Sequence, residues 1–103
     1  MGQYDVHRTR AAQRKHAPYL VVLQSDLVNL IRTAVIAPLR PLRGFGRTAD
    51  RLHVMADFAG EPHVLSLEEM ASVPREVLGE KVGSLGSCRA EILSAIDLLF
   101  TGI

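Results

Sequence analysis

The sequence predicts a small, mainly β domain, in which several short strands form a β-barrel or curved sheet and one C-terminal helix packs beside it. Short runs rich in β-branched residues, separated by Pro, Gly and polar turn residues, fill most of the chain up to residue 66. From Ser87 onward, the apolar residues recur at helical spacing instead. The length of 103 residues suits a single domain, 1–103, with one modest core.

Three candidate strands occupy the first half: Tyr4–His7, Tyr19–Gln24 and Ala34–Ala37. The second and third are rich in Val, Ile and Leu, and the third ends before a proline, which favours strand termination. Between the first two strands, Arg8–Pro18 is basic and shows no apolar face at helical spacing, so we expect an exposed loop. Residues 38–51 are rich in Pro, Gly and Arg and predict a second loop.

The clearest local prediction is a β-hairpin. Leu52–Phe58 places apolar residues on one face, Ala59–Pro62 supplies turn residues, and His63–Ser66 forms the returning strand. Ser66 and Glu69 then match the S-x-x-E pattern of a capping box, which predicts a short helical turn.

The last segment predicts an amphipathic helix with its start signal at Gly86 and Ser87. Its apolar stripe comprises Ile92, Ile96, Leu99 and Ile103. Residues at this spacing usually face a core, so we expect the first three of them to be buried.

Composition and charge exclude several classes of protein. The apolar runs, such as Leu20–Leu23, are far shorter than the ~20 residues that span a bilayer, and the first ten residues lack the apolar segment of a secretory signal. The single cysteine, Cys88, excludes an intrachain disulfide. We therefore expect a cytoplasmic protein with no membrane partner.

Residues 1–51 carry nine Lys or Arg and three Asp or Glu, a balance that suits an acidic partner.

The pattern of titratable residues offers little support for an enzyme. Four histidines are scattered along the chain, and none forms an HExxH motif or lies at metal-ligand spacing with the cysteine: His7, His16, His53 and His63. We therefore predict no enzyme, no catalytic residue, no metal site and no cofactor.

One long block resembles a known family. Met70–Leu85, with the sequence MASVPREVLGEKVGSL, is similar to a stretch of the CcdB toxins of bacterial toxin–antitoxin pairs. The ending Phe-x-Gly-Ile at residues 100–103 resembles the end of the same family, as do Gln24–Asp26 and Val35–Leu39. The resemblance spans almost the whole chain and is strongest from Met70 onward.

The resemblance implies both a fold and a function. CcdB toxins have an SH3-like β-barrel with a C-terminal helix and form two-fold homodimers. They bind the A subunit of DNA gyrase, a topoisomerase, and trap the gyrase–DNA cleavage complex. A CcdA-like antitoxin neutralises them through a disordered C-terminal segment, and the toxin–antitoxin complex binds operator DNA and represses its own operon.

The resemblance also assigns candidate site residues. The gyrase-binding residues would be Asp97, Phe100, Thr101, Gly102 and Ile103. Thr101 stands where the family has Trp, so an aromatic anchor of the kind that dominates many interfaces is missing there. The antitoxin-binding residues would be Arg8, Arg10, Arg14, Lys15, Leu27 and Val28, of which the basic ones suit an acidic tail.

Two alternatives stay open. Endoribonuclease toxins of the MazF and Kid type share the SH3-like barrel, so the fold does not separate them from CcdB toxins. RNA cleavage needs a general acid and base near a cationic site, for which the candidates are Arg32, Arg43 and Arg51 with Asp50 or His53. The second alternative is an antitoxin-binding homologue that no longer poisons gyrase.

Overall fold

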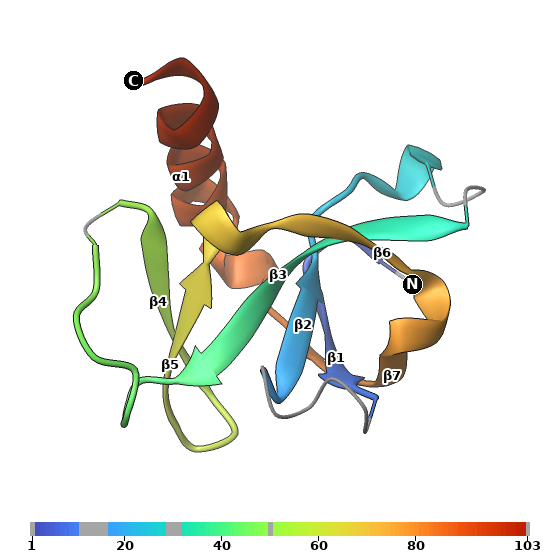
Figure 1. Ribbon diagram of the computed structural model, residues 1–103, viewed down its shortest axis with the longest axis horizontal. Helices are drawn as coiled ribbons and strands as arrows, with labels where there is room; N and C mark the ends of the chain where they lie inside the picture. The colour runs from blue at the N-terminus through green and yellow to red at the C-terminus, as the bar shows by residue number, and fades with distance from the viewer. Residues whose placement is uncertain (1, 11–16, 29–31, 50, 103) are drawn as a thin grey trace.

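The structure is a computed structural model that describes residues 2–10, 17–28, 32–49 and 51–102. Within these ranges, seven strands form one antiparallel sheet, followed by one α-helix (Figure 1). The strands are β1 (Asp5–Thr9), β2 (Tyr19–Val22), β3 (Thr33–Pro41), β4 (His53–Phe58), β5 (Glu61–Ser66), β6 (Ala71–Pro74) and β7 (Leu78–Ser84). The helices are α1 (Arg89–Thr101) and the short 3-10 helices η2 (Asp26–Val28), η3 (Leu67–Glu69), η4 (Arg75–Val77) and η5 (Gly86–Cys88).

The fold class predicted from the sequence is confirmed, but the sheet is not closed. Its hydrogen-bonded order is β4-β5-β3-β2-β1-β7, with β6 paired to β3. In the described chain the two end strands of this order, β4 and β7, share no backbone ladder. A side chain brings them together instead, because a Cβ placed on Gly83 in β7 would lie 2.6 Å from Cε1 of Phe58 in β4. The phenyl ring therefore occupies the space that the glycine leaves free.

Strand β3 continues through Pro38, where the sequence pattern predicts its end. Leu23 N–H donates to Val35 O at 2.9 Å, so odd-numbered residues of β3 point their backbone groups toward β2. The missing N–H of Pro38 then falls on the other edge of β3. There β6 pairs only as far as Ile36 and β5 only from Leu39, so the proline removes no ladder hydrogen bond.

The predicted hairpin is confirmed as β4 and β5, but its turn is shorter than expected. Only Ala59 and Gly60 connect the strands, and both have positive φ (53° and 82°), as a type I′ turn requires. The predicted capping box is wrong. Ser66 makes no side-chain cap to η3, and its hydroxyl is buried without a hydrogen-bond partner.

The main core lies between the sheet and α1. Its fully buried residues include Val6, Val21, Leu39, Leu65, Leu67, Ile92 and Ala95. A smaller cluster of Leu20, Val22, Ala34, Ile36 and Leu78 lies apart from it. The prediction for the helix stripe holds for Ile92 and, in part, for Ile96, but it is wrong for Leu99, which is exposed. Figure 1 shows why: α1 rises away from the sheet, so its last turns have no strand beneath them.

Candidate functional site

The C-terminal end of α1 exposes apolar side chains. Phe100 is 70% exposed and Leu99 is 36% exposed, and their neighbours Asp97, Thr101 and Gly102 are also exposed. Exposing a phenyl ring forgoes roughly 2 kcal/mol of burial free energy, so an unpartnered Phe at a projecting end suggests a binding surface. Ile103 lies outside the described residues.

Local hydrogen bonds give this end a defined shape. Gly102 has φ 76° and donates its N–H to Leu98 O at 3.0 Å, so it ends the helix in the left-handed conformation that glycine favours. Thr101 turns its hydroxyl back and donates to Asp97 O at 2.6 Å. The threonine hydroxyl is therefore used within the helix, and Phe100 is the large side chain left to contact a partner.

The helix end is also electrostatically negative. The last turn contains no basic residue, and the exposed Asp97 lies about one turn before the end of the helix, where the last carbonyl groups have no intrahelical partner. Together with Phe100, this end suits a partner surface that combines an apolar pocket with a cation.

The residues predicted to bind antitoxin form a second region. Leu27 is 92% exposed and Val28 is 44% exposed on η2, which lies across the molecule from the end of α1 (Figure 1). In β1, Arg8 forms an ion pair with Glu80 at 3.0 Å, and its guanidinium carbon lies 5.9 Å from the centroid of the Tyr19 ring. Arg10 is exposed, and Arg14 and Lys15 lie outside the described residues. Within one chain, the residues predicted to bind antitoxin therefore lie apart from those predicted to bind gyrase.

The residues considered for RNA cleavage are not gathered at one point. Arg32 precedes β3 and Arg43 follows it, so a nine-residue strand separates them. Arg43 is paired with Glu61 at 2.8 Å. Asp50 lies outside the described residues, which leaves Arg51 and His53 as the two candidates that share a location.

His53 is held by its surroundings and does not face His63. Its Nδ1 accepts the N–H of Ala49 at 2.8 Å, so Nε2 carries the proton and donates to Glu68 at 2.8 Å. The opposite residue on β5 is Ser66, because β4 and β5 pair in a register that places His63 across from Ala56. His53 and His63 are therefore not cross-strand partners.

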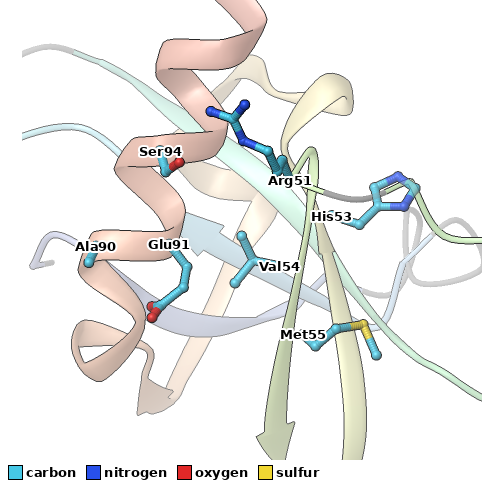
Figure 2. Close-up of a pocket in the computed structure, with 7 residues that line it drawn as sticks. All are labelled: Arg51, His53, Val54, Met55, Ala90, Glu91 and Ser94. Atoms are coloured by element: carbon cyan, nitrogen blue, oxygen red, sulfur yellow. The ribbon is translucent and has the colours of Figure 1, made fainter. Parts of the chain in front are cut away.

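A groove between α1 and β4 is a feature that the sequence analysis missed. It has a volume of about 470 Å³ and is lined by Arg51, His53, Val54, Met55, Ala90, Glu91 and Ser94 (Figure 2). These residues come from two segments some 40 positions apart, and no sequence pattern connects them.

Among the described residues, no three His, Cys, Asp or Glu side chains gather as a metal site would need. No described helix is long and apolar enough to cross a membrane.

Two solved structures with a similar fold are described as toxins. The Mycobacterium tuberculosis toxin MazF-mt6 superposes with a TM-score of 0.76 at 20% sequence identity, over 93% of this chain and 95% of that one. A structure described as an Mtb toxin superposes with a TM-score of 0.73 at 20% identity, over 92% of this chain and 99% of that one. At this level of identity, the likeness concerns the fold.

These structures correct one prediction. MazF toxins are endoribonucleases, and the likeness to them contradicts the prediction that the chain is not an enzyme. The argument from scattered histidines failed because folding can bring distant residues into one site, and absence of a short motif does not exclude catalysis. An enzymatic activity therefore belongs among the candidate functions.

A family comparison agrees with the resemblance seen in the sequence. The family described as CcdB protein matches residues 3–102, which is nearly the whole chain. The match includes α1 with its exposed end, the β4–β5 hairpin and both arginine-rich segments of the sequence. The chain therefore belongs to the CcdB family, and its function is that of a toxin in a toxin–antitoxin system.

Proposed function

We propose that this toxin binds the A subunit of DNA gyrase through the C-terminal end of α1 and traps the gyrase–DNA cleavage complex. Membership of the CcdB family supports this target. The single observation that carries the proposal is the 70% exposure of Phe100 at the projecting end of the helix. In this proposal the toxin acts in the cytoplasm, where gyrase and its DNA substrate are found.

Phe100 takes the role of the aromatic anchor. Thr101 cannot stack on a partner cation, and its hydroxyl already bonds to Asp97 O. Phe100 lies one position earlier on the same exposed end and offers a ring of similar reach. Asp97 would attract a basic residue of gyrase toward that ring.

The proposal includes a homodimer and an antitoxin. Two copies would present two helix ends to the two A subunits of gyrase. A CcdA-like antitoxin with an acidic tail would bind the surface formed by Arg8, Arg10 and the exposed Leu27 and Val28, together with Arg14 and Lys15. The toxin–antitoxin complex would bind operator DNA and repress its own operon.

A gyrase cleavage assay with supercoiled plasmid and ATP tests the target. The toxin should produce linear plasmid, and Phe100→Ser should lower that yield by about tenfold or more, as expected for an anchor residue. The matched control is Met55→Ser, because Met55 is 49% exposed but lies on β4. Thr101→Trp should increase the yield. Equal yields with and without toxin, for both the natural chain and Thr101→Trp, would remove gyrase as the target.

A second candidate function is RNA cleavage, favoured by the superposition on MazF-mt6 over more than nine-tenths of each chain. The test is incubation of the purified toxin with RNA in the absence of gyrase. RNA cleavage that is lost in Arg51→Ala or His53→Ala would assign the toxin to this class. A toxin that neither cleaves RNA nor poisons gyrase, but binds an antitoxin peptide, would be a homologue that no longer poisons.

A further inference from the structure

The β3–β4 loop, residues 42–49, depends for its order on contacts with the rest of the chain. These residues belong to no strand or helix. Gly44 and Gly46 have φ 75° and 91°, and a Cβ added to either would meet no atom within 4 Å, so the backbone there lies in open space. The shape of the loop is therefore set by the groups that hold its two ends.

At the β4 end, one imidazole makes the contacts. Ala49 N–H donates to Nδ1 of His53 at 2.8 Å, and His53 N–H donates back to Ala49 O at 3.0 Å. The Phe45 ring lies edge-to-face against the same imidazole, with 5.2 Å between the ring centroids. The His53 side chain is 8% exposed, so these contacts are largely shielded from water. The imidazole of His53 thus ties both the middle and the end of the loop to β4.

The hydrogen bond from Ala49 requires a neutral imidazole. A backbone N–H can only donate, so Nδ1 of His53 offers its lone pair, and the ring proton lies on Nε2, which donates to Oε2 of Glu68 at 2.8 Å. A proton added to Nδ1 would point at the Ala49 N–H, and two donors cannot form a hydrogen bond with each other. Protonation of His53 therefore breaks its bond to the loop.

The carboxylate of Glu68 makes the protonated state accessible. Glu68 lies on η3 and accepts from Nε2 whether or not Nδ1 carries a proton, and its negative charge stabilises an imidazolium. The cross-strand neighbour of His53 on β5 is Ser66, which is uncharged. Protonation therefore exchanges the backbone hydrogen bond for an ion pair with Glu68.

The other charged groups near the start of β4 point elsewhere. Figure 2 shows the Arg51 guanidinium and the Glu91 carboxylate on the α1 side of β4, whereas the His53 ring lies on the other side. Asp50 lies outside the described residues. On the loop itself, the Arg43 guanidinium pairs with Glu61 at 2.8 Å, near the β3 end. On β3 and η3, Arg40 pairs with Glu69 at 2.8 Å.

We propose that His53 is an acid-sensitive latch, which holds the β3–β4 loop against β4 when its imidazole is neutral and releases the loop when Nδ1 takes up a proton. Histidine changes charge between about pH 5 and pH 8, so a falling pH in this range favours the released loop. Leu42 N–H donates to Pro62 O at 2.9 Å, and neither group titrates, so the β3 end stays attached. The loop therefore opens from its β4 end.

This latch is separate from the surface assigned to gyrase. His53 begins β4, whereas the gyrase contact is assigned to the last residues of α1. A failure of the gyrase proposal would therefore leave the latch unaffected, and the latch can be tested on the toxin alone.

Amide hydrogen exchange of Ala49 in the full chain tests the proposal. Its protection factor, which corrects for the intrinsic effect of pH on exchange, should fall by at least about tenfold between pH 8 and pH 5.5, the scale expected for one lost hydrogen bond. The amide of Leu65, a fully buried residue of β5, reports on unfolding of the whole domain and should keep its protection.

Two variants separate the acceptor from the titration. His53→Asn offers an amide oxygen near the position of Nδ1, which can accept the Ala49 N–H but does not take up a proton, so protection should change by less than about threefold between the two pH values. His53→Phe has no acceptor, so protection of Ala49 should be low at both pH values. The natural chain and His53→Asn decide the question if His53→Phe does not fold.

Three results would overturn the proposal. The first is a protection factor of Ala49 in the natural chain that differs by less than about threefold between the two pH values. The second is an equal loss of protection in His53→Asn, which would assign the effect to another titrating group. The third is an equal loss at Leu65, which would mean that acid unfolds the whole domain and not the loop.

Discussion

The two halves of α1 have similar apolar content but opposite surroundings. In the first half, Ile92 and Ala95 are completely buried in the main core. In the second half, Leu99 and Phe100 are exposed, and a Cβ added to the capping Gly102 would meet no atom within 4 Å. The comparison shows that apolar side chains on one helix can serve stability at one end and recognition at the other. What separates the two roles is the point where the sheet beneath the helix ends.

Ile92→Ala should produce the largest loss of stability. The side chain is fully buried against the sheet, so truncation leaves a cavity and should lower the free energy of unfolding by about 3 kcal/mol. Urea denaturation measures this loss. A change below about 1 kcal/mol would contradict the assignment of the first half of α1 to the core.

Gly83→Ala should produce the next largest effect, because the core beneath α1 depends on the contact between β4 and β7. The new Cβ would lie 2.6 Å from Cε1 of Phe58, which forces the ring to move and should cost about 1–3 kcal/mol. A double-mutant cycle with Phe58→Leu measures the coupling, since a smaller side chain should recover part of the loss. If the two changes were additive, the ring would not be seated on this glycine in solution.

The sequence predicted those parts of the fold whose signals are local. The β4–β5 hairpin followed from alternating residues and a glycine in the turn, and α1 followed from its periodicity. The predicted third strand ended before Pro38, because a proline usually ends a strand, but β3 continues to Pro41. Whether that proline removes a hydrogen bond depends on the gap between β5 and β6, which is a tertiary feature.

The candidate sites were predicted unevenly for the same reason. The end of α1 was named through a family resemblance, and the helical pattern alone placed Leu99 in the core. Periodicity shows on which face of a helix a residue lies, but it does not show how far along the helix the supporting sheet extends. The groove beside β4 was missed because Arg51 and Ser94 meet only in the folded chain. The ion pair of Arg43 with Glu61 likewise joins residues that no short motif connects.

Gly102→Ala should produce a smaller loss, and only at the exposed end of the helix. At φ 76°, a Cβ is strained even though it would meet no atom within 4 Å, so the cost is confined to the backbone and should be about 1 kcal/mol. Gly102→Asn is the matched control, because Asn tolerates the left-handed conformation better and should cost less. Amide hydrogen exchange in the last turn of α1 should accelerate in the Ala variant. Equal losses for Ala and Asn would show that the left-handed cap does not form in solution.

Phe100→Ser should produce the smallest change in stability, and it therefore gives the sharpest contrast with Ile92→Ala. The ring is 70% exposed, so its removal should change the free energy of unfolding by less than about 0.5 kcal/mol. Urea denaturation at two protein concentrations measures this change and separates folding from assembly. A loss above about 1.5 kcal/mol at both concentrations would mean that Phe100 packs within its own chain, and the division of α1 into a core half and a recognition half would fail. A loss that appears only at the higher concentration would place the ring between two copies of the toxin. A near-neutral result would show that Phe100 has no role in the stability of its own chain, as the division of α1 into a core half and a recognition half requires.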